Sequence, residues 1–387
     1  TDDTDLVGTE LVTNGTFDSD ISGWSTNSGV NSWDNGTINV QPTEYQGANQ
    51  VVSVDVGKTY VVSVEVTATT SGRARIYLGT TTSVGAYKNQ SGLFAGVHTF
   101  TITTTSSSLY IGLATTEQTG ANVNFDNVSV RLAEPDRSVN GNGLQVFGTV
   151  QKNPVATGAD LVAYSGFSSS NYLEQPYNSD LDFGTGDFCI MGWIKTTDSY
   201  GVILNRGLPS TGSGEIRVAT YPRSVNGLDF LVAGTTLSST VAVDTGQWVH
   251  IICLRRAGIA QIWIDGKFDN SMSITGSIDS AGMPVTTKIG TRRDFAQFLE
   301  GSIALLRISG TAPTAEQIAK IYRDEKPLFQ ENAQATLHGT SDAVTALAFD
   351  QYTDLLHVGT SAGRSVFSGL QRVDNTTDAV GTAISAS

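Results

Sequence analysis

The sequence alternates short apolar runs with turn residues along most of its length, and this pattern leaves little room for helices. Between residues 10 and 132, strand-like segments are separated by Gly, Asn and Ser, as in β-sandwiches. Within residues 58–67, every second residue from Tyr60 to Val66 is apolar, so we expect that face to form core and the other face, which includes Val61, to meet water. The 41 glycines and a charged fraction of 16 %, against a usual ~25 %, agree with an all-β fold class.

Composition changes along the chain predict three pieces. Residues 133–140 are polar, contain a proline and lack apolar alternation, which is typical of a domain boundary. We therefore predict tandem β-sandwiches over residues 1–134 and 141–330, followed by a small C-terminal β unit with a tail over residues 335–387.

The second piece again reads as strands, with residues 187–195 and 248–255 as its clearest examples. Asp265 and Gly266 form a dipeptide that tolerates the positive φ angles of a type I′ turn, so a hairpin is expected there.

One helix is predicted, at the end of the second piece. Thr314 and Gln317 have the spacing of a capping box, Ile318 and Tyr322 lie on one helical face, and Pro327 ends the pattern.

Charge and cysteine content exclude several functions. Lys and Arg number 23 and Asp and Glu 37, so the net charge of −14 repels nucleic acid and anionic membranes. No apolar run reaches the ~18 residues of a membrane-spanning helix, and no membrane insertion is expected. Cys189 and Cys253 lack CxxC spacing and are expected inside strands.

The third piece contains three short strand-like runs, which cannot bury a core alone. They must pack on the second piece, on another copy of the chain or on a longer parent protein. We expect this piece to make a homo-oligomer, a trimer or a filament. Residues 359–363 match GxSxG, but another strand follows where a nucleophile elbow needs a helix, so a hairpin turn is predicted.

The first piece resembles the jelly-roll carbohydrate-binding modules. Residues 11–17 (LVTNGTF), 56–60 (VGKTY) and 125–130 (FDNVSV) match the opening, middle and closing strands of that family in order. The resemblance implies a structural calcium between the first and last strands, with Glu10 and Asp126 at the positions of its carboxylate ligands. The alternative is that Asp126 only accepts hydrogen bonds from backbone amides.

Sugar binding in such modules requires aromatic faces that stack on pyranose rings, with polar groups nearby. The candidate carbohydrate-binding residues are Trp33, Tyr45, Arg75, Tyr77 and Tyr87. Arg75 and Tyr77 are two residues apart and so lie on one face of a strand. The alternative is that these aromatics are ordinary core or rim residues.

The second piece resembles the laminin G-like, concanavalin A-like lectin domains. The resemblance rests on residues 181–195, 246–250 (GQWVH), 262–266 (IWIDG) and 301–308 (GSIALLRI), in order. It implies two antiparallel sheets with loops on one edge available to glycans or proteins. Arginines at positions 206, 292 and 293 could contact an acidic glycan or be solvated surface.

Catalysis is not expected. The Glu-x-Asp-x-Glu pattern of concanavalin A-like glycosidases is absent from the sequence. The module order also resembles, in style, phage fibre and surface adhesin proteins. We predict a non-enzymatic protein on the outside of a cell or on a virion, bound to glycans through several copies. The rival interpretation is a purely structural capsid, fibre or filament building block, and a glycoside hydrolase is a weaker third.

Overall fold

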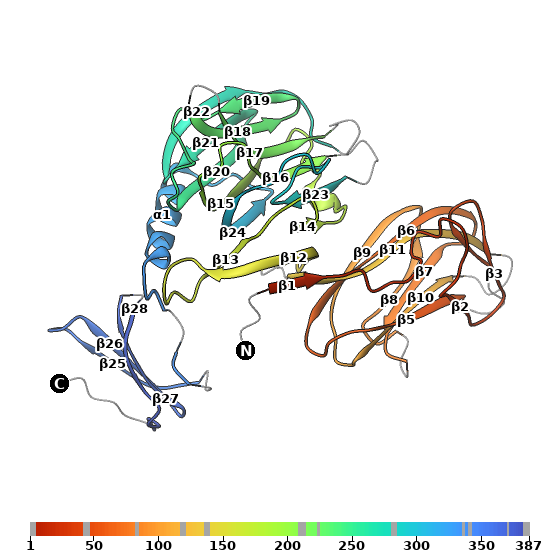
Figure 1. The fold of residues 1–387 in the computed structure, drawn as a ribbon, viewed down its shortest axis with the longest axis horizontal. Coiled ribbons are helices and arrows are strands. Elements are labelled where there is room, and N and C mark those ends of the chain that lie inside the picture. Colours follow the sequence, from red (N-terminus) through yellow and green to blue (C-terminus); the bar gives the residue numbers. More distant parts are fainter. Residues whose placement is uncertain are drawn as a thin grey trace.

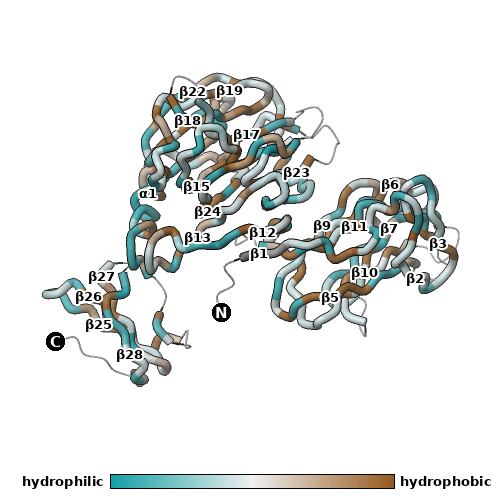
Figure 2. The backbone as a smooth tube through the Cα atoms, in the orientation of Figure 1, coloured by the Kyte–Doolittle hydropathy of each residue, from teal (hydrophilic) through white to brown (hydrophobic). Residues whose placement is uncertain are grey.

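A computed structural model describes residues 5–41, 47–81, 85–116, 121–134, 140–207, 214–222, 225–279, 285–334, 337–339, 343–369 and 371–381. Their architecture is two β-sandwiches followed by a small sheet (Figure 1). The all-β prediction is confirmed. Apolar stretches, brown in Figure 2, run along the strands of both sandwiches, as two-sheet packing requires.

The first sandwich consists of two antiparallel layers around one core. One layer has the order β3 (Val30–Trp33), β4 (Ile38–Gln41), β11 (Asn122–Glu134), β6 (Thr59–Ser71), β9 (Gly96–Thr103). The five-stranded second layer has the order β2 (Ser25–Thr26), β5 (Ala48–Ser53), β10 (Ser108–Thr115), β7 (Ala74–Gly79), β8 (Lys88–Leu93). Tyr60, Val62, Val64 and Val66 of β6 all enter the core, as predicted.

The expectation that the other face of β6 meets water is wrong at Val61, which is fully buried. Val61 pairs with Thr101 of β9, and the backbone N–H of Gly143 donates to the Thr101 hydroxyl at 3.2 Å. The chain entering the second sandwich therefore passes over this face and covers it.

The second sandwich also has two layers. The larger has the order β22 (Lys267–Ser273), β21 (Ile259–Ile264), β20 (Val249–Arg256), β15 (Phe188–Thr196), β24 (Gly301–Ser309), β13 (Val162–Ser165), β12 (Leu144–Pro154), β1 (Asp5–Gly8). The other has the order β14 (Tyr172–Gln175), β23 (Thr286–Ile289), β16 (Val202–Gly207), β17 (Ile216–Pro222), β18 (Asn226–Val232), β19 (Thr235–Ser238), with the short helix η1 (Ser179–Leu181) after β14.

Local predictions in this sandwich are confirmed. Asp265 and Gly266 have φ angles of 49° and 74°, as the predicted β21–β22 hairpin requires. Helix α1 (Ala315–Glu325) begins after the capping box made by Thr314 and Gln317, and η2 (Lys326–Phe329) follows it. Cys189 and Cys253 are buried free thiols on β15 and β20. No helix in the described part of the chain is long and apolar enough to cross a membrane.

The strands nearest the domain boundary connect the two sandwiches. β12 pairs with the end of β11, at Ala133 and Gln145, and with β1 from Asp5 to Gly8. The first strand of the chain thus lies at the edge of the second sandwich, beside β12 (Figure 1).

The C-terminal sheet has the order β25 (Val344–Asp350), β26 (Leu355–Thr360), β27 (Gly363–Ser368), β28 (Gln371–Thr376) and stands beyond α1 in Figure 1. The GxSxG segment forms the β26–β27 hairpin, as predicted. A bridge between Ala333 and Gln371 joins this sheet to the second sandwich. Several large apolar side chains of the sheet are exposed: Val344, Leu347, Phe349, Tyr352, Leu356 and Val373.

Candidate functional site

Two tyrosines lie side by side on the outer face of the five-stranded layer of the first sandwich. In β7 and β10, Ile76 and Ile111 enter the core, so the alternate residues Tyr77 and Tyr110 face outward. Between them, a side chain at Gly112 would place its Cβ 3.0 Å from the Tyr110 ring and 3.3 Å from the Tyr77 Cβ. Glycine at this position lets the two rings approach.

Polar side chains surround this tyrosine pair. Asn27 donates to the Tyr110 hydroxyl at 2.6 Å, and Asn49 donates to the Asn27 side-chain oxygen at 2.7 Å. The Arg75 guanidinium lies 4.7 Å from the Tyr77 ring centre, and its Nε donates to Asn89 at 3.0 Å. Burial raises the pKa of Tyr110, against the hydrogen bond from Asn27, so the hydroxyl stays neutral. Both tyrosines are only 7 % exposed, so the cluster presents no open aromatic face.

The other aromatic candidates do not join this cluster. Trp33 is 45 % exposed at the end of strand β3, and its indole N–H donates to the Phe17 carbonyl at 2.7 Å. Tyr87 packs against the core and its hydroxyl accepts from the Thr105 backbone N–H at 2.9 Å. Tyr45 lies outside the described residues. Of the predicted sugar-binding residues, the structure brings together Arg75 and Tyr77.

Glu10, the first expected calcium ligand, is surrounded by hydrogen-bond donors. Its carboxylate accepts from the Val12 and Val130 backbone N–H groups at 3.0 and 2.8 Å and from the Ser129 hydroxyl at 2.6 Å. The Arg131 guanidinium adds an ion pair at 3.2 Å. Both carboxylate oxygens of Glu10 thus have partners from the protein itself.

Asp126, the second expected ligand, accepts the Asn127 backbone N–H at 2.7 Å and the Asn127 side-chain amide at 3.2 Å. Burial, with help from the charges of Glu65 and Asp18, raises its pKa. Within the described ranges, no group of three or more His, Cys, Asp or Glu side chains is arranged to hold a metal. Calcium binding stays a prediction.

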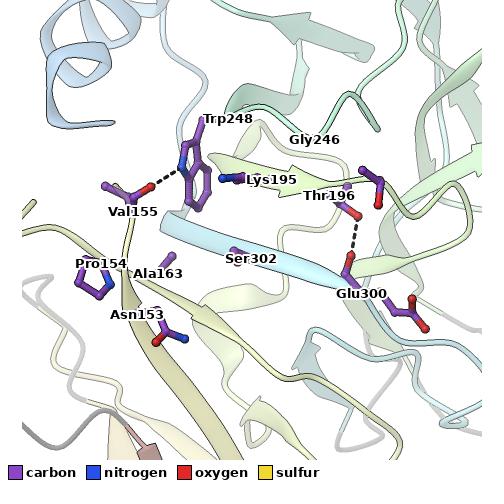
Figure 3. Close-up of a pocket in the computed structure, with 11 residues that line it drawn as sticks. Asn153, Pro154, Val155, Ala163, Lys195, Thr196, Gly246, Trp248, Glu300 and Ser302 are labelled. Carbon is purple, nitrogen blue, oxygen red and sulfur yellow. Dashed lines mark hydrogen bonds between the residues drawn. The ribbon is translucent and has the colours of Figure 1, made fainter. Parts of the chain in front are cut away.

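The second sandwich has a hollow of about 310 Å³ on the outer face of its larger layer, beside Trp248 (Figure 3). Ile194 and Ile303 of β15 and β24 enter the core, so their neighbours Lys195 and Ser302, which pair with each other, face outward into the hollow. We call this hollow the Trp248 pocket, and its lining includes Asn153, Lys195, Thr196, Trp248, Glu300 and Ser302.

The ring of Trp248 is fixed in place at the pocket wall. Its indole N–H donates to the Val155 carbonyl at 2.9 Å (Figure 3). Its ring packs on Phe329, with centroids 4.9 Å apart. The ring is half-buried, so part of it remains at the surface. Lys195 and Asn153 are exposed around it and offer charged and amide hydrogen-bonding groups. A fixed aromatic ring with polar side chains around it suits a polyol.

In the sequence, Trp248 belongs to the GQWVH motif, and no pattern there indicates the other residues of this pocket. Lys195 could have been recognised from the sequence as an outward-facing residue, because it is a polar residue near the end of an apolar strand. Its neighbours in the pocket come from β12 and β24, more than 40 residues away in either direction, and no local pattern indicates them. In the first sandwich, the alternation around Tyr110 would have identified that residue as outward-facing.

The three arginines that the sequence suggested as glycan contacts lie in three different environments. Arg206 is 2 % exposed, forms an ion pair with Asp182 and donates to two backbone carbonyls, so the expectation of a loop-like, glycan-contacting or solvated side chain is wrong there. Arg293 pairs with Glu215. Arg292 lines a second hollow.

Comparison with known proteins supports the fold of the second sandwich. The model of the concanavalin A-like lectin/glucanases superfamily matches residues 167–319, which run from before β14 into α1. Residues 167–319 are therefore similar to the concanavalin A-like domains, within an all-β protein of tandem sandwiches. No curated protein matched the chain.

Three solved structures show partial likeness. A heptameric SAP-like pentraxin from Limulus polyphemus is 17 % identical over 39 % of this chain and 75 % of its own, with a TM-score of 0.33. Domain 4 of an extracellular arabinanase from Geobacillus stearothermophilus, solved with arabinotriose, is 16 % identical over 45 % and 82 %, with a TM-score of 0.36. The binding domain of Paraclostridial Mosquitocidal Protein 1 is 16 % identical over 60 % and 62 %, with a TM-score of 0.40, so the chain spans less than two thirds of it.

Proposed function

We propose that this chain is a non-enzymatic carbohydrate-binding protein that holds sugar in the Trp248 pocket. The observation that carries this proposal is a fixed, partly exposed indole beside Lys195 and Asn153, in a domain of a lectin-containing superfamily. The hollow of about 310 Å³ lies at the lower end of the ~300 to 1,000 Å³ typical of small-molecule sites. Apolar sugar faces pack on aromatic rings, while the flanking amide and ammonium groups meet hydroxyls.

Binding is favoured over hydrolysis by the acids around the pocket. Among the described residues lining it, Glu300 is the one carboxylate, whereas glycoside hydrolysis uses two that flank the scissile bond. The nearby Asp198 carboxylate already accepts the Glu300 backbone N–H at 3.2 Å and the Tyr200 backbone N–H at 2.8 Å. A sugar can be held here without a second acid to activate water.

The tyrosine pair of the first sandwich is a second proposed contact surface. Arg75, Tyr77 and Tyr110 combine aromatic and polar groups on one sheet face, and Trp33 adds an exposed side chain on the other layer. The predicted structural calcium belongs to this sandwich and is tested below by chelation.

Multicopy display outside a cell or on a virion is part of the proposal. Weak single sites become firm attachment when several act together. Exposed apolar side chains such as Leu347, Phe349 and Tyr352 on the C-terminal sheet support an assembly contact there. The alternative is a structural building block that uses the same contact and binds no sugar.

A glycan array with the full chain tests this function, with and without a calcium chelator. We expect selective binding that Trp248→Ala and Lys195→Ala reduce at least tenfold, while Phe268→Ala, at an exposed aromatic on β22, serves as the control and Trp33→Ala tests the first sandwich. Lys195 is exposed, so its variant tests the pocket even where Trp248→Ala lowers stability. A blank array from folded protein would favour the structural alternative. Loss with Trp33→Ala alone would move the site to the first sandwich, and loss on chelation would support calcium.

A further inference from the structure

A second hollow lies on the opposite outer face of the same sandwich, over β16 and β17. Ile216 and Val218 of β17 enter the core, so Arg217 and Tyr221 face outward into it. Its volume is about 210 Å³. The aromatic and polar residues that line it are Tyr200, Arg217, Thr220, Tyr221, Arg292 and Gln297. The volume is below the ~300 Å³ where sites for larger ligands begin, so it suits a single ring.

Two tyrosines form its aromatic wall. The rings of Tyr200 and Tyr221 have centroids 4.9 Å apart and are inclined by 51°. Tyr200 is 46 % exposed. Thr220 anchors the backbone directly after Tyr200: its hydroxyl accepts the Gly201 N–H at 2.7 Å and donates to the Gly201 carbonyl at 3.2 Å. The wall is therefore held to the sheet rather than carried on a free loop.

Arg292 is positioned by Gln297. Its backbone N–H donates to the Gln297 carbonyl at 2.7 Å and its guanidinium to the Gln297 side-chain oxygen at 3.2 Å. Its Nε is buried without an aligned hydrogen bond, although an Asp294 carboxylate oxygen lies 3.3 Å away. The guanidinium is thus held in place with donor capacity left.

The charged side chains that line this pocket are both cationic. Arg217 and Arg292 are among the described lining residues, and no carboxylate is. The nearby carboxylates lie outside the lining: Glu215 is 3.9 Å from Arg217 and also pairs with Arg293, Asp294 pairs with Arg292, and Asp229 pairs with Ala219 across β17 and β18. Two arginines facing the hollow in a chain of net charge −14 favour an anionic ligand.

We propose that this arginine–tyrosine pocket binds a sugar residue that carries a carboxylate. Arg217 and Arg292 supply the forked donors that match carboxylate geometry, and Tyr200 and Tyr221 supply the surface for the pyranose ring. The proposal rests on the proposed function only in that the ligand is again a saccharide, and it names the class of that saccharide. This pocket and the Trp248 pocket lie on different sheets, so each can be tested without the other.

Calorimetric titration of the full chain with methyl β-D-glucuronide tests the proposal. We expect millimolar binding, and at least tenfold weaker binding of methyl β-D-glucoside and of the glucuronide methyl ester, which have the same ring without the charge. This comparison needs no variant and does not depend on folding of a mutant. Equal affinity for the acid and its ester would overturn the proposal, and so would displacement of the uronide by sodium acetate at equal concentration, which would indicate an anion site only.

Variants locate the site. Arg217→Gln and Arg292→Gln should each weaken glucuronide binding at least fivefold, and Arg217→Lys should restore only part of it because lysine lacks the fork. Arg364→Gln, which removes an arginine from the C-terminal sheet, is the matched control and should leave binding unchanged. Glucuronide binding that survives both pocket variants would contradict the proposal. Trp248→Ala should leave it intact, so failure here and failure of the Trp248 pocket are distinguishable.

Discussion

The guanidinium of Arg131, near the end of β11 in the first sandwich, lies 4.1 Å from the ring centre of Phe147 on β12. The same Phe147 ring stacks on Tyr172 of the second sandwich, with centroids 4.5 Å apart and planes 10° from parallel. Arg131 also forms an ion pair with Glu10, at 3.2 Å. One half-buried phenylalanine thus links the cation of one sandwich to the aromatic side chains of the next.

Replacing Phe147 with alanine should loosen this joint. Loss of the cation–π and stacking contacts should cost about 1 to 3 kcal/mol, and calorimetry should show the two sandwiches melting in separate transitions. Phe268→Ala is the control, because Phe268 is 53 % exposed far from the joint. A single unshifted transition in the Phe147 variant would contradict the assigned role.

His250 should make stability depend on pH. It is fully buried between Trp193 and Tyr322, with ring centroids 5.0 and 5.9 Å away, and neither ring nitrogen has a hydrogen-bond partner among the described residues. Burial, helped by the charge of Arg307, lowers its pKa from 6.5 to about 4. The unfolded chain binds the proton more readily, so stability should fall by about 3 kcal/mol as pH drops from about 6.5 to about 4.

Denaturant titrations across this pH window measure the effect. His250→Phe should flatten the dependence between those two pKa values, while His98→Gln, on β9 of the first sandwich, should leave it in place. The same slope in wild type and His250→Phe would assign the dependence to other groups.

Removing only one partner of the ion pair between Lys288 and Glu174 should strongly lower the stability of the fold. Both residues are buried on neighbouring strands, β23 and β14, and burial lowers the pKa of Lys288 to about 8. Glu174→Gln should destabilise the fold by about 3 to 5 kcal/mol by leaving the ammonium uncompensated. The double variant Glu174→Gln, Lys288→Met should recover most of this loss. Additive losses in urea unfolding would show that the two side chains act independently.

Exposed apolar residues on the C-terminal sheet should control assembly. Leu347, Phe349 and Leu356 share one face of β25 and β26, because Phe349 pairs with Leu356 and lies two residues from Leu347. Leu347→Ser with Phe349→Ser should shift a trimer or filament toward monomer in light scattering. Val30→Ser, an equally exposed apolar position in the first sandwich, is the control. A wild-type monomer at micromolar concentration would contradict the assembly proposal.

Short-range patterns predicted most of the fold. The alternation in β6, the Asp265–Gly266 turn and the Thr314 capping box each depend on neighbouring residues, so the sequence alone was sufficient. The pairing of β1 with β12 joins residues more than 130 positions apart, and no local pattern encodes it.

The residues of the candidate sites likewise fall into those that a local pattern predicts and those that only the fold brings together. Arg75 and Tyr77 were predictable as neighbours because they belong to one strand. Lys195 and Ser302 meet only through the β15–β24 register, and Arg217 and Arg292 come from separate segments of the second sandwich. Arg206 had the surroundings of a loop residue in the sequence, yet folding placed it beside Asp182 in the interior.

The placement of β1 also determines how the protein responds to mechanical load. Gly8 and Leu144 both lead toward the first sandwich, while β12 is held in the second by β13 and β14. A force that separates the sandwiches therefore pulls on β1 at its Gly8 end and on β12 at its Leu144 end, so the hydrogen bonds between β1 and β12 share the load with the chain that enters β12. An attachment protein under flow would gain a joint that resists pulling.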